Sequence, residues 1–292
     1  MRLSRRSLLQ LALTLPLAGG VKAALPPQRI AVLDWGLTEL LLSLGVTPLA
    51  VSAPQWYRQL IGLPTLPAQV QDIGLLFQPN LEALYGLKPD LIIITPAHAM
   101  SKPMLEAIAP TLTLATGRLA SFYASCDKLA TRLALKPQAA RLRAGLDQQL
   151  LHTQDALRQQ AATPCYLASP VDDLHIRLYG ENSFFNDVMQ RVGLTNAWRG
   201  AVNAQGEAQV EIQQIAGSQH ARLLIMPAPG QSPAALRGWT QSRLWRALPL
   251  TRCPQRIVLP HAISESGALL SAQRFAHDLE TTLTTLSGAH CD

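Results

Sequence analysis

The middle of the chain reads PQAARLRAGLDQQLLHTQDALRQQAA from residue 137 to residue 162. Apolar side chains recur at helical spacing at Leu142, Leu146, Leu150 and Leu157. Pro137 suits the first turn of a helix, and Pro164 follows its expected end. The segment predicts one helix of about 24 residues, or ~36 Å at 1.5 Å per residue. A helix of this length in mid-chain can cross a whole domain, so we interpret it as the connection between two lobes.

Strands and helices alternate on both sides of this segment. The strand candidates are residues 29–33, 46–51, 88–94, 111–115, 165–168, 222–226 and 256–259. The clearest candidate, residues 88–94, ends in a continuous apolar run. Such a run is typical of a strand in a parallel sheet that is covered on both faces. The alternation predicts an α/β protein with an N-terminal lobe (residues 24–136), a connecting helix (137–162) and a C-terminal lobe (163–292). Ligands of such sheets bind outside the carboxyl ends of the strands, so those loops supply the candidate contacts.

The first 23 residues have the order of a secretory signal peptide, with a basic start, an apolar run and small residues. The apolar run is too short to span a bilayer, which takes about 20 residues. Residues 4–9, SRRSLL, resemble the twin-arginine export motif, and we expect cleavage after Ala23. The first cysteine is Cys126, so no lipid anchor is expected at the cleavage site. We therefore predict a protein released into the periplasm.

The charge balance changes once this signal is set aside. The 292 residues carry 25 basic and 19 acidic side chains, a net charge of +6. The segment before the predicted cleavage site holds four basic residues, Arg2, Arg5, Arg6 and Lys22, and no acidic residue. The exported chain therefore has a net charge of +2. The basic excess is thus largely an export signal, and we expect no nucleic-acid partner.

Four cysteines, Cys126, Cys165, Cys253 and Cys291, form neither a C-x-x-C motif nor a zinc-binding spacing. A twin-arginine substrate folds in the reducing cytoplasm before export, so the fold should not depend on disulfides. We expect free buried thiols. Three pairings remain open for an oxidising compartment, with Cys165–Cys253 the first to test.

Several short motifs together resemble one family over nearly all of residues 25–286. They are Asp72-Ile-Gly74, Gln78-Pro-Asn-Leu-Glu82, Leu87-Lys-Pro-Asp-Leu-Ile92, Gly180-Glu-Asn-Ser-Phe-Phe-Asn-Asp-Val188 and Trp245-Arg-Ala-Leu-Pro249. The chain resembles the periplasmic substrate-binding proteins of ABC importers, in the helical-backbone class that carries ferric siderophores, cobalamin and haem. Within that class it is most similar to the iron(III)-hydroxamate (ferrichrome-type) branch.

The resemblance implies two rigid lobes joined by the long helix, with a ligand cleft between them. It implies a monomeric binding protein rather than an enzyme, and iron enters only as part of the bound ferric siderophore. The partners would be that ligand and an inner-membrane permease with its cytoplasmic ATPase. In this family acidic residues on each lobe dock onto the permease, and the candidates here are Glu106, Glu207 and Glu211. Solvated acids on exposed faces are the alternative interpretation of these three.

A hydroxamate siderophore presents apolar methylenes and an oxygen shell around Fe(III), which aromatic walls and a cation would suit. The candidate ligand-binding residues are Trp35, Trp56, Tyr57, Phe77, His98, Asn203, Gln205, Ser264 and Glu265. Trp35 and Tyr57 match aromatic positions of the family, and the others follow from the cleft loops. Packing beneath the first helix is the alternative for Trp35, and anchoring of a surface loop is the alternative for Trp56.

The hydroxamate pattern is incomplete in this chain. Leu76 stands where the family has its siderophore-binding Arg, and His98 replaces a Tyr. In the second lobe Gln205 and residues 264–266 replace aromatic residues. A cleft that is less aromatic and less cationic should prefer a different ligand or bind the same one weakly. We therefore expect a ferric siderophore, with the hydroxamate type favoured, but not ferrichrome itself.

Other cargoes and functions stay open at this point. The same fold could bind haem, cobalamin or a bare Zn or Mn ion, and His98 with Glu265 could complete the shell of a tetradentate Fe(III) siderophore. An enzyme is less well supported, because the sequence contains no G-x-S-x-G, H-E-x-x-H or P-loop motif. The adjacent pair Asp172-Asp173 would point to opposite faces of a strand and could not act together.

Overall fold

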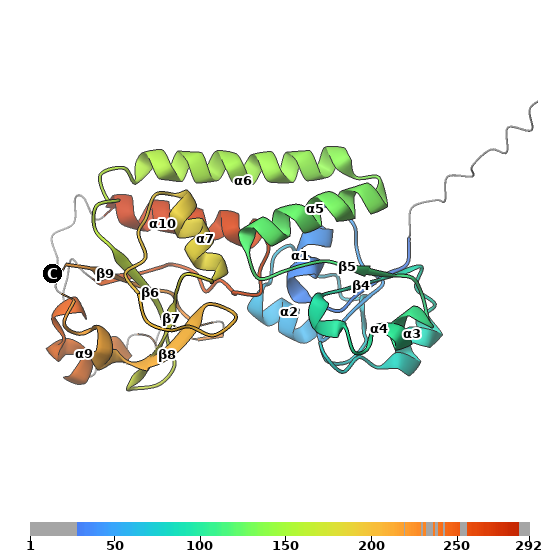
Figure 1. The fold of residues 1–292 in the computed structure, drawn as a ribbon, viewed down its shortest axis with the longest axis horizontal. Coiled ribbons are helices and arrows are strands. Elements are labelled where there is room, and N and C mark those ends of the chain that lie inside the picture. Colours follow the sequence, from blue (N-terminus) through green and yellow to red (C-terminus); the bar gives the residue numbers. More distant parts are fainter. Residues whose placement is uncertain are drawn as a thin grey trace, which may run out of the picture.

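The computed structural model describes residues 28–285 except 219, 229, 232–235, 237–238, 242 and 252–255. The predicted signal peptide, residues 1–23, lies outside the described residues, and so do Cys253 and Cys291. Two α/β lobes lie side by side beneath helix α6 (Lys136–Ala156), which spans both (Figure 1). The predicted fold class is thereby confirmed.

The N-terminal lobe is built on a five-stranded parallel sheet in the order β3-β2-β1-β4-β5. Its strands are β1 (Ile30–Val32), β2 (Ala50–Val51), β3 (Gln71–Asp72), β4 (Leu91–Ile94) and β5 (Thr111–Thr113). Its helices are α1 (Trp35–Ser43), α2 (Pro54–Leu60), α3 (Leu81–Leu87), η1 (Pro96–His98), α4 (Lys102–Glu106) and α5 (Leu119–Leu133). The central strands β1 and β4 are completely buried, as their continuous apolar sequences predict.

The C-terminal lobe has a mixed sheet in the order β10-β9-β6-β7-β8. Its strands are β6 (Cys165–Pro170), β7 (His175–Tyr179), β8 (Glu207–Glu211), β9 (Arg222–Ile225) and β10 (Arg256–Val258). Its helices are α7 (Phe184–Arg191), η2 (Ile212–Ile215), α9 (Arg243–Ala247), η3 (Pro249–Thr251) and α10 (Leu269–Thr285). The strands β6, β9 and β10 run parallel, whereas β7 pairs antiparallel with both β6 and β8.

A tight turn between β6 and β7 explains this reversal. The Asp172 carboxylate accepts hydrogen bonds from the backbone N–H groups of Leu174 (2.9 Å) and His175 (2.8 Å). Aspartate favours turns because its side chain can bond the backbone two or three residues ahead in this way. Asp172-Asp173 therefore lies in a turn, and the prediction that the pair lies on a strand is wrong.

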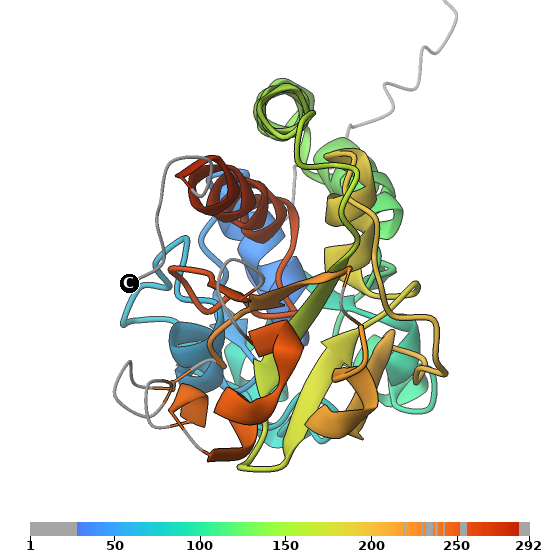
Figure 2. The ribbon, with the colours of Figure 1, turned by 90° about the vertical axis from the view of Figure 1, so that its left-hand side faces the viewer.

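Helix α6 is shorter than predicted, with 21 residues that end at Ala156 instead of residue 162. Residues 157–162 continue as turns. The helix lies above α10 on one side and above α5 and α7 on the other (Figure 2). Its buried side chains, among them Leu146 and Leu150, face that layer. Within the described ranges, none of the helices combines the length and the apolar character that a membrane crossing requires.

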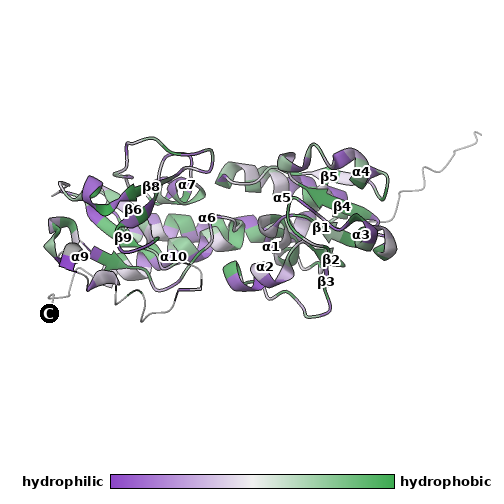
Figure 3. Cartoon of the chain, turned by 90° about the horizontal axis from the view of Figure 1, so that it is seen from below, coloured by the Kyte–Doolittle hydropathy of each residue, from purple (hydrophilic) through white to green (hydrophobic). Residues whose placement is uncertain are grey.

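One hydrophobic core passes from lobe to lobe beneath α6. The ring of Phe122 on α5 packs edge-on against Phe184 of α7, with centroids 6.0 Å apart. Phe184 contacts Phe185 at 5.5 Å, and Phe185 contacts Phe275 of α10 at 4.9 Å. Strands β4 and β6 are strongly hydrophobic within their respective lobes (Figure 3). The lobes are therefore packed against each other and not merely tethered, which limits their relative movement.

Candidate ligand cleft

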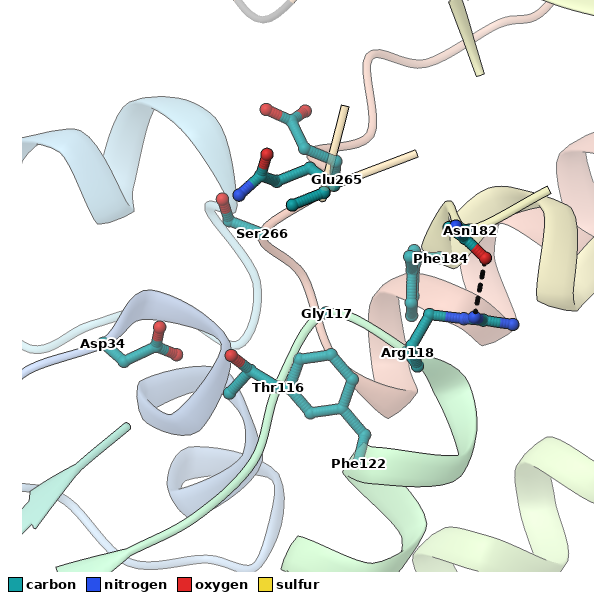
Figure 4. Close-up of a pocket in the computed structure, with 11 residues that line it drawn as sticks. Asp34, Thr116, Gly117, Arg118, Phe122, Asn182, Phe184, Glu265 and Ser266 are labelled. Carbon is teal, nitrogen blue, oxygen red and sulfur yellow. Dashed lines mark hydrogen bonds between the residues drawn. The ribbon is translucent and has the colours of Figure 1, made fainter. Parts of the chain in front are cut away.

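A cavity of about 310 Å³ lies between the two lobes (Figure 4). The N-terminal lobe lines it with Asp34, Thr116, Gly117, Arg118 and Phe122. The C-terminal lobe lines it with Asn182, Phe184, Ala204, Gln205, Glu265 and Ser266. Asp34 follows strand β1, and residues 116–118 follow β5, so the cavity opens beside the carboxyl ends of parallel strands, where α/β folds bind ligands.

The floor of the cavity is apolar. Phe122 and Phe184 both line it, and each is only 1% exposed. Because their rings also hold the lobes together, the floor belongs to the rigid part of the molecule. Such a surface suits the methylene groups of a ligand, and the polar side chains above it can bind its oxygen and nitrogen atoms.

Arg118 is the only cation among the described residues that line the cavity, and an acidic partner already binds it. Its Nε donates to Oδ2 of Asp187 (2.8 Å), and its Nη2 donates to Oδ1 (2.5 Å). Asp187 also accepts from the backbone N–H of Leu119 at 2.9 Å, so this carboxylate of the C-terminal lobe caps helix α5 of the other lobe. The hydrogen bonds from Arg118 to Asp187 raise the pKa of the guanidinium above its ordinary value.

Two carboxyl groups line the cavity, one from each lobe (Figure 4). Asp34 is the N-cap of α1 and accepts from the backbone N–H of Leu37 at 2.8 Å. Burial raises the pKa of Asp34 above its ordinary value, although this hydrogen bond opposes the shift. Burial also raises the pKa of Glu265, and the nearby charge of Glu207 adds to the shift.

Of the nine predicted ligand-binding residues, Gln205 and Glu265 line the cavity. Trp35 lies directly after Asp34, but its indole N–H donates to the carbonyl of Ser52 (3.0 Å), so it fastens α1 to the end of β2. Trp56 and Phe77 are 50% and 65% exposed and are not among the lining residues. Their proposed role in ligand binding stays a prediction.

Tyr57 does not line the cavity, and its role in ligand binding stays a prediction. Its side chain is completely buried in the core of the N-terminal lobe. The hydroxyl group donates to the carbonyl of Pro64 at 2.9 Å, which holds the loop after α2. The side chain of Tyr57 therefore supports the fold.

His98 is 3% exposed and does not line the cavity, and its role in ligand binding stays a prediction. Its Nδ1 accepts from the backbone N–H of Thr95 (3.2 Å), and its Nε2 donates to the carbonyl of Leu76 (2.7 Å). Because both ring nitrogens are engaged, the side chain clamps two loops and leaves no lone pair for iron. Across the described parts of the chain, no three His, Cys, Asp or Glu side chains cluster as a metal site would require.

Asn203 and Ser264 shape cleft loops without facing the cavity. The side-chain oxygen of Asn203 accepts from the backbone N–H groups of Gln205 (3.0 Å) and Glu207 (2.9 Å). Ser264 is buried, and its hydroxyl accepts from the N–H of Ser266 at 3.2 Å. Both side chains therefore position the lining residues Gln205 and Ser266.

The predicted docking acids occupy different surroundings. Glu106 is exposed, lies 3.6 Å from the Lys102 ammonium and accepts from the Thr111 hydroxyl. Glu207 begins β8 and lies 4.0 Å from Arg177, whereas Glu211 ends the same strand. Their contact with a permease stays a prediction.

Sequence reasoning missed several lining residues, above all Arg118, Thr116 and Asn182. Residues 116–118 follow β5, which matches the predicted strand 111–115. The rule that ligands bind at the carboxyl ends of strands therefore applies to them as well. Asp34 was beside a chosen residue, but Trp35 was preferred on family likeness. Asn182 lies in the loop after strand β7, which was not among the predicted strands.

The cysteines described by the structure, Cys126 and Cys165, are buried free thiols, as expected. Cys165 donates to the carbonyl of Thr163 at 3.4 Å. Burial raises the pKa of each thiol to about 11.

Comparisons with known proteins agree with the fold. A family model described as periplasmic binding protein matches residues 30–262. The chain is 30% identical to the iron(3+)-hydroxamate-binding protein FhuD of Escherichia coli K12, over 96% of this chain and 97% of that protein. It is 28% identical to the achromobactin-binding periplasmic protein of Dickeya dadantii 3937, over 94% of each chain. The solved structure of Vibrio cholerae FhuD with Fe3+-Desferal superposes with a TM-score of 0.79 at 24% identity, over 89% of this chain and 98% of that one.

Proposed function

The chain belongs to the family of periplasmic binding proteins, and from this premise we propose that it captures a ferric siderophore for an ABC importer. The hydroxamate type is favoured, and the cargo is handed to an inner-membrane permease. The observation that carries the proposal is the similarity to an iron(3+)-hydroxamate-binding protein, which extends over both lobes. A relative named for achromobactin points to the same class of cargo.

The cleft supports this function chemically. Its apolar floor of Phe122 and Phe184 can take the methylene chains of a siderophore, and Gln205 and Asn182 offer amide groups to its oxygen atoms. The docked lobes favour a preformed site, which lowers the ordering cost of binding.

A titration of intrinsic fluorescence tests the proposal. Trp35 lies next to the lining residue Asp34, so a ferric complex in the cleft should quench its emission. The purified protein is titrated with ferric hydroxamate, citrate-type and catecholate complexes, and thermal unfolding is followed in parallel. A ligand present at 100 times its Kd should raise the unfolding free energy by about 2.7 kcal/mol. Failure of every ferric complex to quench or stabilise would refute the function.

The same experiment covers the other cargoes. A shift of the Soret band on adding haemin would indicate a haem carrier, and metal retained by the purified protein would indicate a metal carrier. Neither of these cargoes has an observation of its own in the described structure.

Further parts of the proposal concern location and partners. We infer that residues 1–23 direct export, that the protein works in the periplasm without a lipid anchor, and that it acts as a monomer without catalysing a reaction. Mass spectrometry of periplasmic protein should show an N-terminus near Ala24, and gel filtration should give the mass of one chain. Delivery to a permease would be tested by charge reversal at Glu106, Glu207 and Glu211, which should impair uptake without weakening ligand binding.

A further inference from the structure

The charges around the cleft are almost all engaged within the protein. Arg118 is bound by Asp187, and Arg177 lies 4.0 Å from Glu207. Arg177 is the cation that offsets the charge of Glu265, but Glu207 is a second acidic partner of the same guanidinium. None of these cations is therefore left free to bind an anionic ligand.

The helix N-termini at the lobe boundary are occupied as well. Asp34 caps α1, Asp187 caps α5, and Glu39 accepts from the first backbone N–H groups of α10 at Ala268 and Ser271 (3.0 Å each). A free helix N-terminus attracts anions, and a carboxylate at that position removes most of the attraction. The caps thus take away a second source of affinity for negative ligands.

Glu265 differs from the other acids of the cleft. It lines the cavity, and in the part of the chain that the structure describes no other residue donates a hydrogen bond to its carboxylate. In Figure 4 its side chain lies above Ser266, with the carboxylate directed away from Asp34. A carboxylate in such a position is complementary to a cationic hydrogen-bond donor on a ligand.

We propose that Glu265 is a specificity-determining residue that binds a protonated amine of the cargo. The cleft then selects ferric siderophores that carry a cationic amine over neutral or anionic ones. This inference rests on the proposed function, because it concerns the choice among ferric siderophores. A partly exposed pair of one carboxylate and one ammonium is worth about a 2–5-fold preference at low salt.

A matched pair of ligands tests the inference. Fe3+-Desferal is a trihydroxamate complex with a free terminal amine, and N-acetylation of that amine removes its charge while leaving the iron centre unchanged. The Kd of each complex is measured by fluorescence titration with wild type, with Glu265→Gln, and with Asp155→Asn as a matched control. Asp155 is an exposed acid of α6 that pairs with Arg158 and is not among the residues that line the cavity.

Wild type and the control should bind the amine complex about 2–5-fold more tightly than the acetylated one, whereas Glu265→Gln should bind both equally. The wild-type preference should also shrink near 1 M salt, where screening acts within about 3 Å. Equal binding of both complexes by wild type overturns the inference but leaves the proposed function intact. A preference that survives in Glu265→Gln overturns it too. Failure of both complexes and of all other ferric siderophores to bind refutes the proposed function itself.

Discussion

The carboxylate of Glu39 accepts the hydroxyl hydrogen of Ser271 across the lobe boundary, with Oε2 and Oγ 2.5 Å apart. Glu39 lies on α1 of the N-terminal lobe and is completely buried, whereas Ser271 lies in the first turn of α10. Asp187 makes the reciprocal contact from the C-terminal lobe to the start of α5. Each lobe thus caps a helix packed against the other, and a rotation between them would leave buried donors without partners.

The first prediction concerns this buried cap. Glu39→Gln replaces one acceptor oxygen by an NH2 group. This donor then faces a backbone N–H of α10, so neither group has an acceptor. We expect the unfolding free energy to fall by about 1–3 kcal/mol, measured by urea denaturation. Glu82→Gln, at an exposed position of α3, is the control and should change it by less than about 0.5 kcal/mol. Equal effects of both substitutions would contradict the role of the cap.

The same carboxyl predicts a dependence on pH. Burial raises the pKa of Glu39 above its ordinary value of 4.5, although hydrogen bonds from Ser271 and Ala268 oppose the shift. The folded state therefore holds the proton more tightly than the unfolded state. This contribution to stability is complete below about pH 4.5 and is lost as the pH rises through the folded-state pKa. The difference in unfolding free energy between wild type and Glu39→Gln should shrink with rising pH. A constant or growing difference would contradict a raised pKa of Glu39 in the folded state.

Much of the fold is visible in the sequence where apolar patterns are strong. Strand β4 and helix α6 follow from a continuous apolar run and from leucines at helical spacing. Strand β8 reads Glu-Ala-Gln-Val-Glu and was missed, because it is a half-exposed edge strand that lacks an apolar run. Strand β3 was missed because it has only two residues, both exposed.

The site was less predictable than the fold for a physical reason. Glu265 lies in the loop after strand β10, which the general rule for α/β sheets identifies, whereas Gln205 lies just before β8 and does not follow a strand. Arg118 meets Asp187 only because two helices from different lobes converge, and no local pattern records that approach. Likewise, the burial of Tyr57 and His98 depends on which loops close over them, so their chemistry alone made them seem available.

His98 provides a test that separates a structural role from a ligand-binding one. His98→Ala leaves the Leu76 carbonyl and the Thr95 N–H without their partners, so we expect a loss of about 1–3 kcal/mol in unfolding free energy. The Kd for Fe3+-Desferal should change by less than about threefold, because His98 does not line the cavity. A tenfold weaker Kd at unchanged melting temperature would instead assign His98 to ligand binding.

The buried thiols should be chemically silent in the folded protein. With the pKa of Cys126 and Cys165 raised to about 11, only about one thiol in a thousand is ionised at pH 8. In a variant with Cys253→Ser and Cys291→Ser, we expect no reaction with a disulfide reagent until urea unfolds the chain. Two thiols should then react. Rapid modification of the folded variant would show that one of these side chains is accessible.

The pairing of Arg118 with Asp187 predicts how the charge of the cleft can be changed. Asp187→Asn keeps the shape of the side chain but removes the negative charge that neutralises Arg118. The substitution also weakens the cap of α5, so the unfolding free energy should fall by about 1–2 kcal/mol. The released guanidinium would give the cavity an uncompensated positive charge. A tris-catecholate ferric complex, which is anionic, should then gain affinity relative to Fe3+-Desferal. The double variant Arg118→Gln/Asp187→Asn should lose this gain in affinity. If the double variant keeps the gain, the gain does not come from the Arg118–Asp187 pair.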